Sequence, residues 1–546
     1  MAAGEGSWDR FLGPRVSGLS SGATWVLLAT ALAVAAAAGL VLLDYGAGRD
    51  QAIYRLIAAV VAEGGAPYLD AWDFKPPGIF AVYALARGIF GPGESAVRVL
   101  ELLGLASLLP AFWLLSRRAL GDGRAGLLGA SLAVLAYVPL GFWDTAQPEG
   151  FGGMLLAWAL VFATVPDEPG RRTVLSWTLA GALYGAAALL KPHLGLGIVV
   201  SIAFAVADRS TPRLRARPIL AFAVGGLLPV ALTLGWFAAR GALAALHEAL
   251  FVFAPHYTAL NLAEPGPLEL LTRTAAPLLR FSTAELAGLV ALCALPIAAG
   301  AERRFSAHVL AVALLVLLGV GVQAKFFPYH YASVLLLLAL PAGWGFWKLW
   351  LAVADRPLGW LLVAVGAILL ALPFHPGGRE LGIFARHAVI RLEASRRLPP
   401  EREAILDRLH SLADVDAASN RRVARWLELN TSPEEPIYVW GFEPGIYDLA
   451  GRRPASRFIY NVPQRAAWSA EASRRELMEE LAAKPPAAIV VVTGDRFPHV
   501  TGSEQDGAEA LGSFDALSQL IDRRYTPVTR IGDIEIHRWA DAGPRP

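Results

Sequence analysis

Cysteine is nearly absent from this sequence, which contains a single one, Cys293, within the apolar run GLVALCALPIAA. One cysteine excludes a disulfide framework and a cysteine-ligated metal site. Charged residues are also scarce, at 17% of the chain against about 25% in typical soluble proteins. The net charge is only +2, so the overall charge indicates neither a strongly acidic nor a strongly basic partner.

Hydrophobic residues, in contrast to charged ones, are abundant. They make up 55% of the 546 residues, against a usual value of about 45–50%. The mean hydropathy is +0.47. This composition excludes a disordered chain and a soluble nucleic-acid binder, and it predicts a polytopic membrane protein that carries a smaller polar part.

We predict eleven membrane spans, since a spanning helix needs about 20 apolar residues. The first run lacks a convincing small-residue cleavage site, so we expect an uncleaved span rather than a signal peptide. The predicted spans are 22–43, 96–115, 124–141, 150–166, 173–190, 194–208, 217–239, 284–300, 307–322, 331–351 and 357–373.

The stretch 78–90 (GIFAVYALARGIF) decides the predicted topology, because it is apolar but short and contains Arg87. If it lies at the interface instead of spanning, the arginine-rich short loops all fall on one side of the membrane. By the positive-inside rule that side is cytoplasmic. The N-terminus is then cytoplasmic, and the tail after residue 373 is outside.

The tail has a different character, with frequent charges and short apolar runs. PIYVWGF and AAIVVVTG are typical of buried strands, and RELMEELAA and FDALSQLIDRRY of amphipathic helices. We therefore predict a transmembrane catalytic domain over 1–373 with its first outer loop at 44–95. A helical connector over 374–425 and an extracytoplasmic α/β domain over 426–546 follow.

The first outer loop concentrates polar groups in an otherwise apolar chain. Asp50 begins a helical pattern that Gly64 and Gly65 end. Asp50 is either the helix N-cap or an ionised carboxylate near the positive end of the helix dipole, able to act as a general base, and the two roles are compatible. The pattern's apolar face is Ile53, Leu56, Ile57, Val60 and Val61.

Downstream, the same loop reads Trp72-Asp73-Phe74-Lys75-Pro76-Pro77-Gly78. Paired prolines keep the preceding residues out of a helix. In an extended segment Asp73 and Lys75 face the same side, so both can serve one site. The alternative is a solvated turn before an interfacial helix.

Lysine is the rarest cation here, present only at Lys75, Lys191, Lys325, Lys348 and Lys484. The first three lie in predicted outer loops, against the positive-inside bias, and a compact ammonium is a good partner for phosphate. The alternative for each is interfacial snorkelling.

Further candidate residues lie in the later outer loops. Glu149 stands at the mouth of a predicted span, where a carboxylate is costly unless it is paired or functional. The alternative is an acid in the first helical turn that the helix dipole favours. Lys191 precedes Pro192-His193. Lys325 is followed by Phe-Phe-Pro and by Tyr329 and His330.

Together these loops place three carboxylates (Asp50, Asp73, Glu149) and three ammonium groups at one face of the membrane. A base would deprotonate an acceptor hydroxyl or amine, and the lysines would stabilise a departing phosphate, as when a sugar leaves a lipid phosphate. No nucleotide-binding fingerprint appears. We predict no metal and no cofactor; a divalent cation at Asp50 and Glu149 is conceivable but unsupported by the sequence.

In this order, Asp50, Asp73-Phe74-Lys75-Pro76-Pro77, Glu149, Lys191-Pro192 and the segment from Lys325 to Tyr331 resemble the GT-C glycosyltransferases. The nearest branch is that of bacterial relatives of protein O-mannosyltransferases and the lipid A aminoarabinose transferase, the family 39-like glycosyltransferases. Two departures stand out. Gln51 follows Asp50 where relatives often have a second acid, and Glu149 replaces an aspartate of several relatives.

The resemblance implies a polyprenyl-phosphate-linked hexosyl or pentosyl donor, a glycan, lipid or protein acceptor, and transfer outside a bacterial cytoplasmic membrane. It implies that Asp50 is the catalytic base and that Asp73 and Glu149 are secondary acids. The three lysines, with Tyr329 and His330, would bind the lipid phosphate.

The tail segment that includes Arg452, Arg453 and Arg457 is similar to outer domains of bacterial members. Its arginines would meet an acidic glycan or lipid, or else form surface ion pairs.

Two other functions remain open from the residues alone. A transporter or lipid flippase would carry ionisable or broken-helix sites near the bilayer midplane and internal repeats. Here the ionisable groups are in predicted outer loops and the two halves show no repeat. A membrane anchor for the tail would need fewer spans.

Overall fold

The structure is a computed structural model, and it describes residues 22–165, 171–207, 212–262, 266–281, 283–294, 300–353, 386, 389–410 and 416–540. The chain divides into two compact units. The helical unit comprises Met1–Asp44, Arg98–Thr233 and Gly266–Ala388. The mixed unit comprises Tyr45–Val97, Leu234–Pro265 and Val389–Pro546. The first outer loop and the segment from 234 to 265 therefore belong to the same compact unit as the C-terminal residues.

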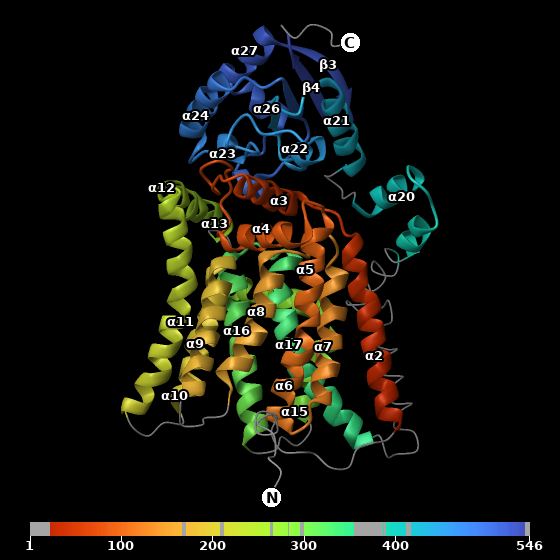
Figure 1. Cartoon of the computed structure of the whole chain (residues 1–546), viewed down its shortest axis with the longest axis vertical. Helices are drawn as coiled ribbons and strands as arrows, with labels where there is room; N and C mark the ends of the chain where they lie inside the picture. Colours follow the sequence, from red (N-terminus) through yellow and green to blue (C-terminus); the bar gives the residue numbers. More distant parts are fainter. Residues whose placement is uncertain are drawn as a thin grey trace, which may run out of the picture. The chain divides into compact units, whose positions relative to one another are not determined.

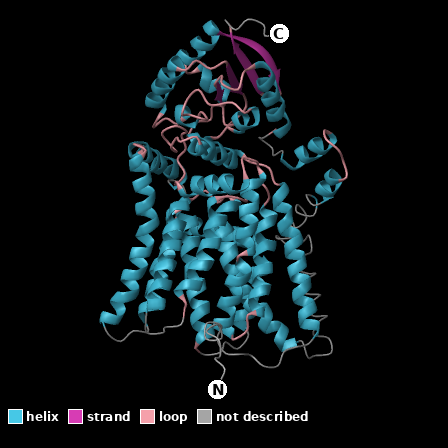
Figure 2. Ribbon diagram, in the orientation of Figure 1, coloured by secondary structure: helices cyan, strands magenta, loops and turns pink. Residues whose placement is uncertain are grey.

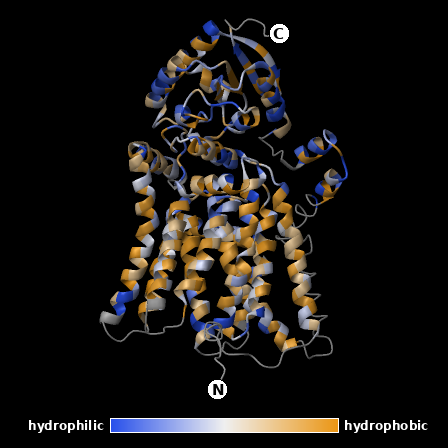
Figure 3. Ribbon diagram, in the orientation of Figure 1, coloured by the Kyte–Doolittle hydropathy of each residue, from blue (hydrophilic) through white to orange (hydrophobic). Residues whose placement is uncertain are grey.

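The helical unit consists of apolar helices, most of them labelled in Figure 1 and mostly orange in Figure 3. The boundary between the two units falls inside α5 and α11. The elements are α2 (Gly22–Leu40), η1 (Val41–Asp44), α5 (Ser95–Ala106), α6 (Leu108–Leu120), α7 (Arg124–Tyr137), η2 (Val138–Leu140), α8 (Pro148–Ala163), α9 (Arg171–Leu190), η3 (Pro192–Leu196), α10 (Gly197–Ala207), α11 (Pro212–Ala239), α14 (Pro267–Phe281), α15 (Thr283–Ala294), α16 (Ala301–Gln323), η5 (Pro328–Tyr331) and α17 (Ala332–Val353).

Six described helical segments are long and apolar enough to cross a membrane, and the bent pair Pro267–Arg280 and Ala284–Cys293 would make a seventh. The six are Gly22–Asp44, Ser95–Leu120, Thr173–Leu190, Arg215–Ala239, Ala301–Gln323 and Pro328–Val353. Three further predicted spans are shorter apolar helices, Arg124–Leu140, Pro148–Ala163 and Pro192–Ala207. The predicted span 357–373 lies outside the described residues, so a total of eleven stays a prediction.

The core of the helical unit lies around α17, which is buried along most of its length. Glycines let neighbouring helices approach closely: a methyl group at Gly343 of α17 would lie 2.6 Å from the backbone of Gly129 in α7. One at Gly345 would meet the backbone of Gly288 in α15. Within lipid, the hydrophobic effect does not drive apolar helices together. Small residues at their contacts allow the close packing that holds them instead.

The mixed unit contains two helices of the first outer loop, α3 (Arg49–Ala62) and α4 (Gly78–Phe90). The rings of Tyr54 and Tyr83 join them edge to face, with centroids 5.3 Å apart. The other helices, several of them labelled in Figure 1, are α12 (Leu243–His247), η4 (Glu248–Phe253), α13 (Ala254–Leu262), α20 (Glu401–His410), α21 (Ala417–Asn430), α22 (Gly445–Ala450), α23 (Val462–Arg465), α24 (Ala470–Ala483), α25 (Pro498–Thr501), α26 (Gly507–Gly512) and α27 (Asp515–Arg524).

A four-stranded sheet, magenta in Figure 2, has the strand order β1-β2-β4-β3. β1 (Ile437–Trp440) and β2 (Ala488–Val492) are parallel, paired from Ile437 with Ala488 to Trp440 with Val491. β3 (Tyr525–Ile531) and β4 (Ile534–Trp539) complete it with antiparallel pairing. Both parallel strands are buried on both faces, as their apolar sequences predict. The tail thus contains a small sheet, and the segments predicted as strands and amphipathic helices are β1, β2, α24 and α27.

Candidate active site

Asp50 lies in the first turn of α3, which begins at Arg49 after the extended residue Gly48. Gly48 occupies the N-cap position, and no side chain caps the helix, so the alternative that Asp50 caps it is wrong. The helix begins earlier because Gly48 adopts the extended cap conformation and leaves Asp50 inside the first turn. The carboxylate still benefits there from the positive end of the helix dipole.

Lys75 reaches back across the loop to Asp50. Its Nζ lies 2.9 Å from Asp50 Oδ1, and the two side chains are 11% and 19% exposed. The ammonium also lies 5.4 Å from the centroid of the Tyr54 ring. Tyr68 fixes the backbone by donating its hydroxyl to the carbonyl of Lys75 at 2.7 Å. The structure therefore pairs the first-loop acid Asp50 with Lys75, two candidate residues that the sequence analysis named without pairing them.

Asp73 is fully buried beside this pair. Its Oδ1 accepts a hydrogen bond from the hydroxyl of Tyr460 at 2.7 Å. Burial raises the pKa of Asp73, against the opposing charge of Lys75 and the hydrogen bond from Tyr460. Tyr460 is absent from the predicted site, because a tyrosine in a run of apolar residues resembles ordinary core.

Electrostatics favour the charged form of the lysine. Burial by itself lowers the pKa of Lys75, but the charges of Asp50 and Asp73 and the hydrogen bond to Asp50 outweigh it, and the net shift is upward. Tyr257 of α13 faces the same charges, and burial raises its pKa to about 12. Lys75 is therefore a permanent cation between two acids at neutral pH. We call Asp50, Asp73, Lys75, Tyr257 and Tyr460 the first-loop cluster.

A second cluster of predicted residues lies in the helical unit. Glu149 is fully buried in the first turn of α8, where Pro148 takes the first helical position. Lys191 Nζ is 3.2 Å from Glu149 Oε1, and His330 Nε2 is 3.8 Å from the same oxygen. Lys191 also donates to Gln323 Oε1 at 3.1 Å. We call Glu149, Lys191 and His330 the α8 cluster.

The remaining predicted residues are close to the α8 cluster in sequence and structure. The backbone N–H of Tyr329 donates to Asp144 Oδ1 at 3.3 Å, and its ring packs against His330 with centroids 4.4 Å apart. Lys325 is half-buried, and burial lowers its pKa to about 8. The structure thus brings Lys191 and His330 within 4 Å of Glu149 and places the Tyr329 ring against His330.

The loop that precedes Glu149 is held by an ion pair that the sequence analysis did not single out. Arg98 and Glu101 of α5 are buried 3.0 Å apart. Arg98 donates to Thr145 Oγ1 at 2.9 Å, and Glu101 accepts from the Tyr137 hydroxyl at 2.5 Å and from the N–H of Ala146. The available signal was two opposite charges three residues apart at the start of an apolar span.

The arginines of the tail make protein contacts. Arg452 donates to the carbonyls of Glu428 and Thr431 at 3.0 and 2.6 Å. Arg453 pairs with Glu63 at 3.2 Å, and Arg457 pairs with Glu476 at 2.6 Å. Arg453 and Arg457 therefore form ion pairs, whereas Arg452 binds backbone carbonyls. Within the described part of the chain, no three His, Cys, Asp or Glu side chains are grouped to hold a metal ion.

Residues 74–236 match the family model described as dolichyl-phosphate-mannose-protein mannosyltransferase. No curated protein matches the sequence. The structure is similar to that of ArnT from Cupriavidus metallidurans bound to undecaprenyl phosphate, with a TM-score of 0.62 and 18% identity, covering 96% of this chain and 100% of that one.

The apo state of the same ArnT gives a TM-score of 0.59 at 18% identity, with the same coverage of both chains. The archaeal oligosaccharyltransferase AglB from Archaeoglobus fulgidus gives 0.47 at 15% identity, covering 96% of this chain and 75% of that one. The family model and the ArnT fold confirm the resemblance stated from the sequence.

Proposed function

We propose that this chain, a multi-pass membrane protein with the GT-C fold, is a glycosyltransferase. It moves a hexosyl or pentosyl group from a polyprenyl-phosphate carrier to an acceptor on the outer face of a bacterial cytoplasmic membrane. The observation that carries the proposal is the bonded pair of Asp50 and Lys75 in a fold shared with an ArnT structure that holds undecaprenyl phosphate.

In the proposed reaction Asp50 is the general base. Its carboxylate accepts the proton of an acceptor hydroxyl or amine, the acceptor forms a bond to the anomeric carbon, and the bond from that carbon to the phosphate oxygen breaks. The electron pair of the broken bond leaves with the polyprenyl phosphate. Partial exposure of Asp50 supports this role, because a base must be reached by the acceptor.

Lys75 supports the other half of the reaction. The departing phosphate gains negative charge, and a cation fixed beside it stabilises the transition state more than the ground state. Lys75 stays protonated because Asp50 and Asp73 raise its pKa above the usual value. We assign donor binding to Lys75, Lys191 and Lys325, together with Tyr329 and His330. Asp73 holds Lys75 in place in the first-loop cluster, and Glu149 holds Lys191 in the α8 cluster.

The test uses purified protein in lipid nanodiscs. A panel of polyprenyl-phosphate sugars is offered with a membrane extract as acceptor, and release of free polyprenyl phosphate is followed. We expect release by wild type and none above background by Asp50→Asn. The matched control is Asp70→Asn: Asp70 is also in the first outer loop but is exposed and bonds the backbone N–H of Ala66 at 2.7 Å. Equal release by wild type and Asp50→Asn would reject Asp50 as the base.

A further inference from the structure

We infer that the C-terminal segment 389–546 positions both carboxylates of the first-loop cluster: Tyr460 holds Asp73, and Glu443 holds the start of α3, and with it Asp50, through Arg49. The inference deepens the proposed function and rests on it for the catalytic meaning of Asp50 and Asp73. The contacts themselves are a property of the mixed unit alone.

The first contact is the hydrogen bond from Tyr460. Both Tyr460 and Asp73 are fully buried, and their bond of 2.7 Å joins residues 387 positions apart. The backbone around it is joined as well. The N–H of Trp72 donates to the carbonyl of Arg457 at 2.7 Å, and Arg457 Nη1 donates to the carbonyl of Tyr68 at 3.0 Å. The segment 457–460 therefore runs along the loop that carries Asp73.

Aromatic packing excludes water from this contact. The Trp72 ring lies 5.7 Å from the ring of Tyr460 and 4.7 Å from that of Phe253. Phe74 packs against Tyr257 at 4.6 Å. A hydrogen bond to a carboxylate is stronger in such surroundings than in water, since little solvent competes for it.

The second contact is a buried ion pair. Arg49 Nε and Nη2 both donate to Glu443 Oε1, at 3.0 and 2.7 Å. Asn420 of α21 donates to Glu443 Oε2 at 2.7 Å. The Arg49 guanidinium also lies 4.6 Å from the centroid of the Phe497 ring. Because Arg49 directly precedes Asp50, fixing this guanidinium fixes the first turn of α3.

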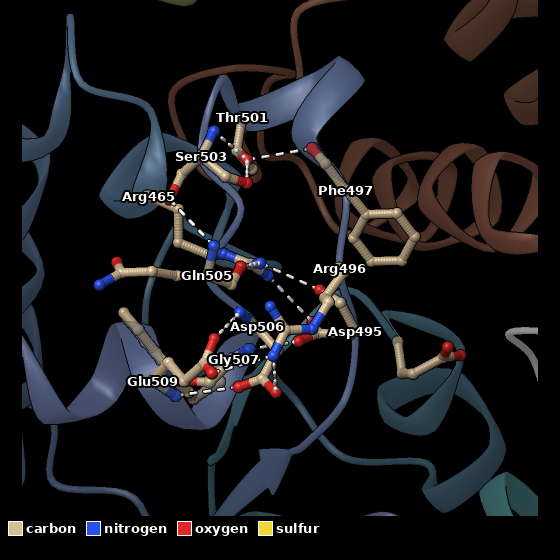
Figure 4. Close-up of polar contacts among 12 residues, drawn as sticks. Arg465, Asp495, Arg496, Phe497, Thr501, Ser503, Gln505, Asp506, Gly507 and Glu509 are labelled. Carbon is tan, nitrogen blue, oxygen red and sulfur yellow. Dashed lines mark hydrogen bonds and ion pairs between the residues drawn. The ribbon is translucent and has the colours of Figure 1, made fainter.

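The position of Glu443 explains why it can do this. Glu443 follows the carboxyl end of β1, and Asp495 follows that of the parallel strand β2. This edge is where α/β sheets present their functional loops. Asp495 is held internally by Arg465 at 3.2 Å and by the N–H of Gly507 at 2.5 Å, as Figure 4 shows. Glu443 instead pairs with Arg49 of α3, so the loop that follows β1 contacts the first outer loop.

Tyr460→Phe tests the first contact, since it removes only the hydroxyl. The control is Tyr438→Phe, because Tyr438 is equally buried in the same segment and its hydroxyl has no hydrogen-bond partner among the described residues. We expect Tyr460→Phe to lower kcat/KM about 10- to 100-fold, the cost of a lost bond to a charged group. Tyr438→Phe should leave it within about twofold.

A positioning role predicts two results that simple destabilisation does not. Tyr460→Phe should have no further effect when Asp73 is already Ala, because the acceptor of the bond is gone. The acidic limb of the pH profile should move to higher pH, because the Tyr460 hydrogen bond lowers the pKa of Asp73. A wild-type rate and profile in Tyr460→Phe, or losses that add fully in the double variant, would overturn the role of Tyr460.

Glu443→Gln tests the second contact by hydrogen–deuterium exchange on the full chain in nanodiscs. We expect exchange in the first turn of α3 to rise at least about tenfold, with that in α27 unchanged. Arg49→Gln should give the same pattern, and the double variant should be no worse than either single one. Unchanged exchange in α3 would overturn the positioning of Asp50 by Glu443.

The two failures are distinguishable. Absence of release from every donor by the wild type would reject the proposed function, yet the exchange measurement would still decide whether segment 389–546 holds α3. Release by wild type with unchanged behaviour of both variants would keep the function and reject the inference.

Discussion

The first-loop cluster and the α8 cluster are built from the same groups but differ in access. In the first, Asp50 and Lys75 are 19% and 11% exposed. In the second, Glu149 is fully buried and lies within 4 Å of both Lys191 and His330. A carboxylate that an acceptor can reach suits proton transfer, whereas a buried one suits holding a cation in place. The difference supports the proposal that Asp50 carries out the chemistry and that Glu149 has a positioning role.

The largest effect should come from Asp50→Asn. Asparagine keeps the shape but cannot take a proton, and general-base catalysis contributes about 10²–10⁴-fold to a rate. We expect kcat to fall by that factor, with the thermal unfolding temperature within about 2 °C of wild type because the residue is partly exposed. Radiolabelled-sugar transfer with differential scanning fluorimetry measures both. An unfolding temperature that drops with the rate would remove the contrast with the α8 cluster.

Glu149→Gln should act through stability as well as rate. Removing one partner of a buried ion pair leaves the charge of Lys191 unpaired and costs about 3–5 kcal/mol. We expect a clear fall in the unfolding temperature and a loss of transfer of about 10²-fold. Glu269→Gln is the control, since Glu269 forms an exposed pair with Arg273 at 2.5 Å. A Glu149→Gln protein that is stable but fully inactive would instead mark Glu149 as a second base.

Lys75→Gln and Lys191→Gln compare the two cations. If Lys75 stabilises the departing phosphate, its loss should lower kcat by about 10- to 100-fold. If Lys191 mainly binds the donor in the ground state, its loss should raise KM about tenfold with kcat little changed. Steady-state kinetics over a range of donor concentrations separates the two. The same kcat effect in both variants would contradict the division of roles.

The smallest effect concerns pH. Burial lowers the pKa of Lys325 to about 8, so its charge is present at neutral pH and is lost as the pH rises through 8. Lys75 has a raised pKa and contributes nothing in this range. We expect donor binding to weaken severalfold between pH 7 and 9. Lys325→Arg, which stays charged, should abolish this alkaline limb, and its persistence would assign the limb to another group.

Sequence patterns predicted the local features well. The period of Ile53, Leu56 and Ile57 predicted α3, whose buried face includes them. The apolar runs predicted β1 and β2, because strands buried on both faces need side chains without polar groups. β3 was not predicted, since most of its residues are exposed or half-buried and it lacks that signal.

The candidate residues were found for a similar reason. In a chain with few charges, a carboxylate or lysine beside an apolar run is costly unless it has a partner, and this singled out Asp50, Lys75, Glu149 and Lys191. The structure then paired Asp50 with Lys75 and Glu149 with Lys191. These pairings could not be predicted, because each acid had three lysines available to it in the sequence.

The sequence by itself determined that this is a membrane protein, where its apolar helices lie and which polar residues require an explanation. These follow from the cost of exposing apolar groups to water and of burying charges, and both costs are set locally along the chain. Only the tertiary structure decided that Tyr460 meets Asp73 and that Glu443 meets Arg49, across 387 and 394 residues. Such partners depend on how the mixed unit packs distant segments together, and a hydrogen bond becomes specific only once both groups are held away from water.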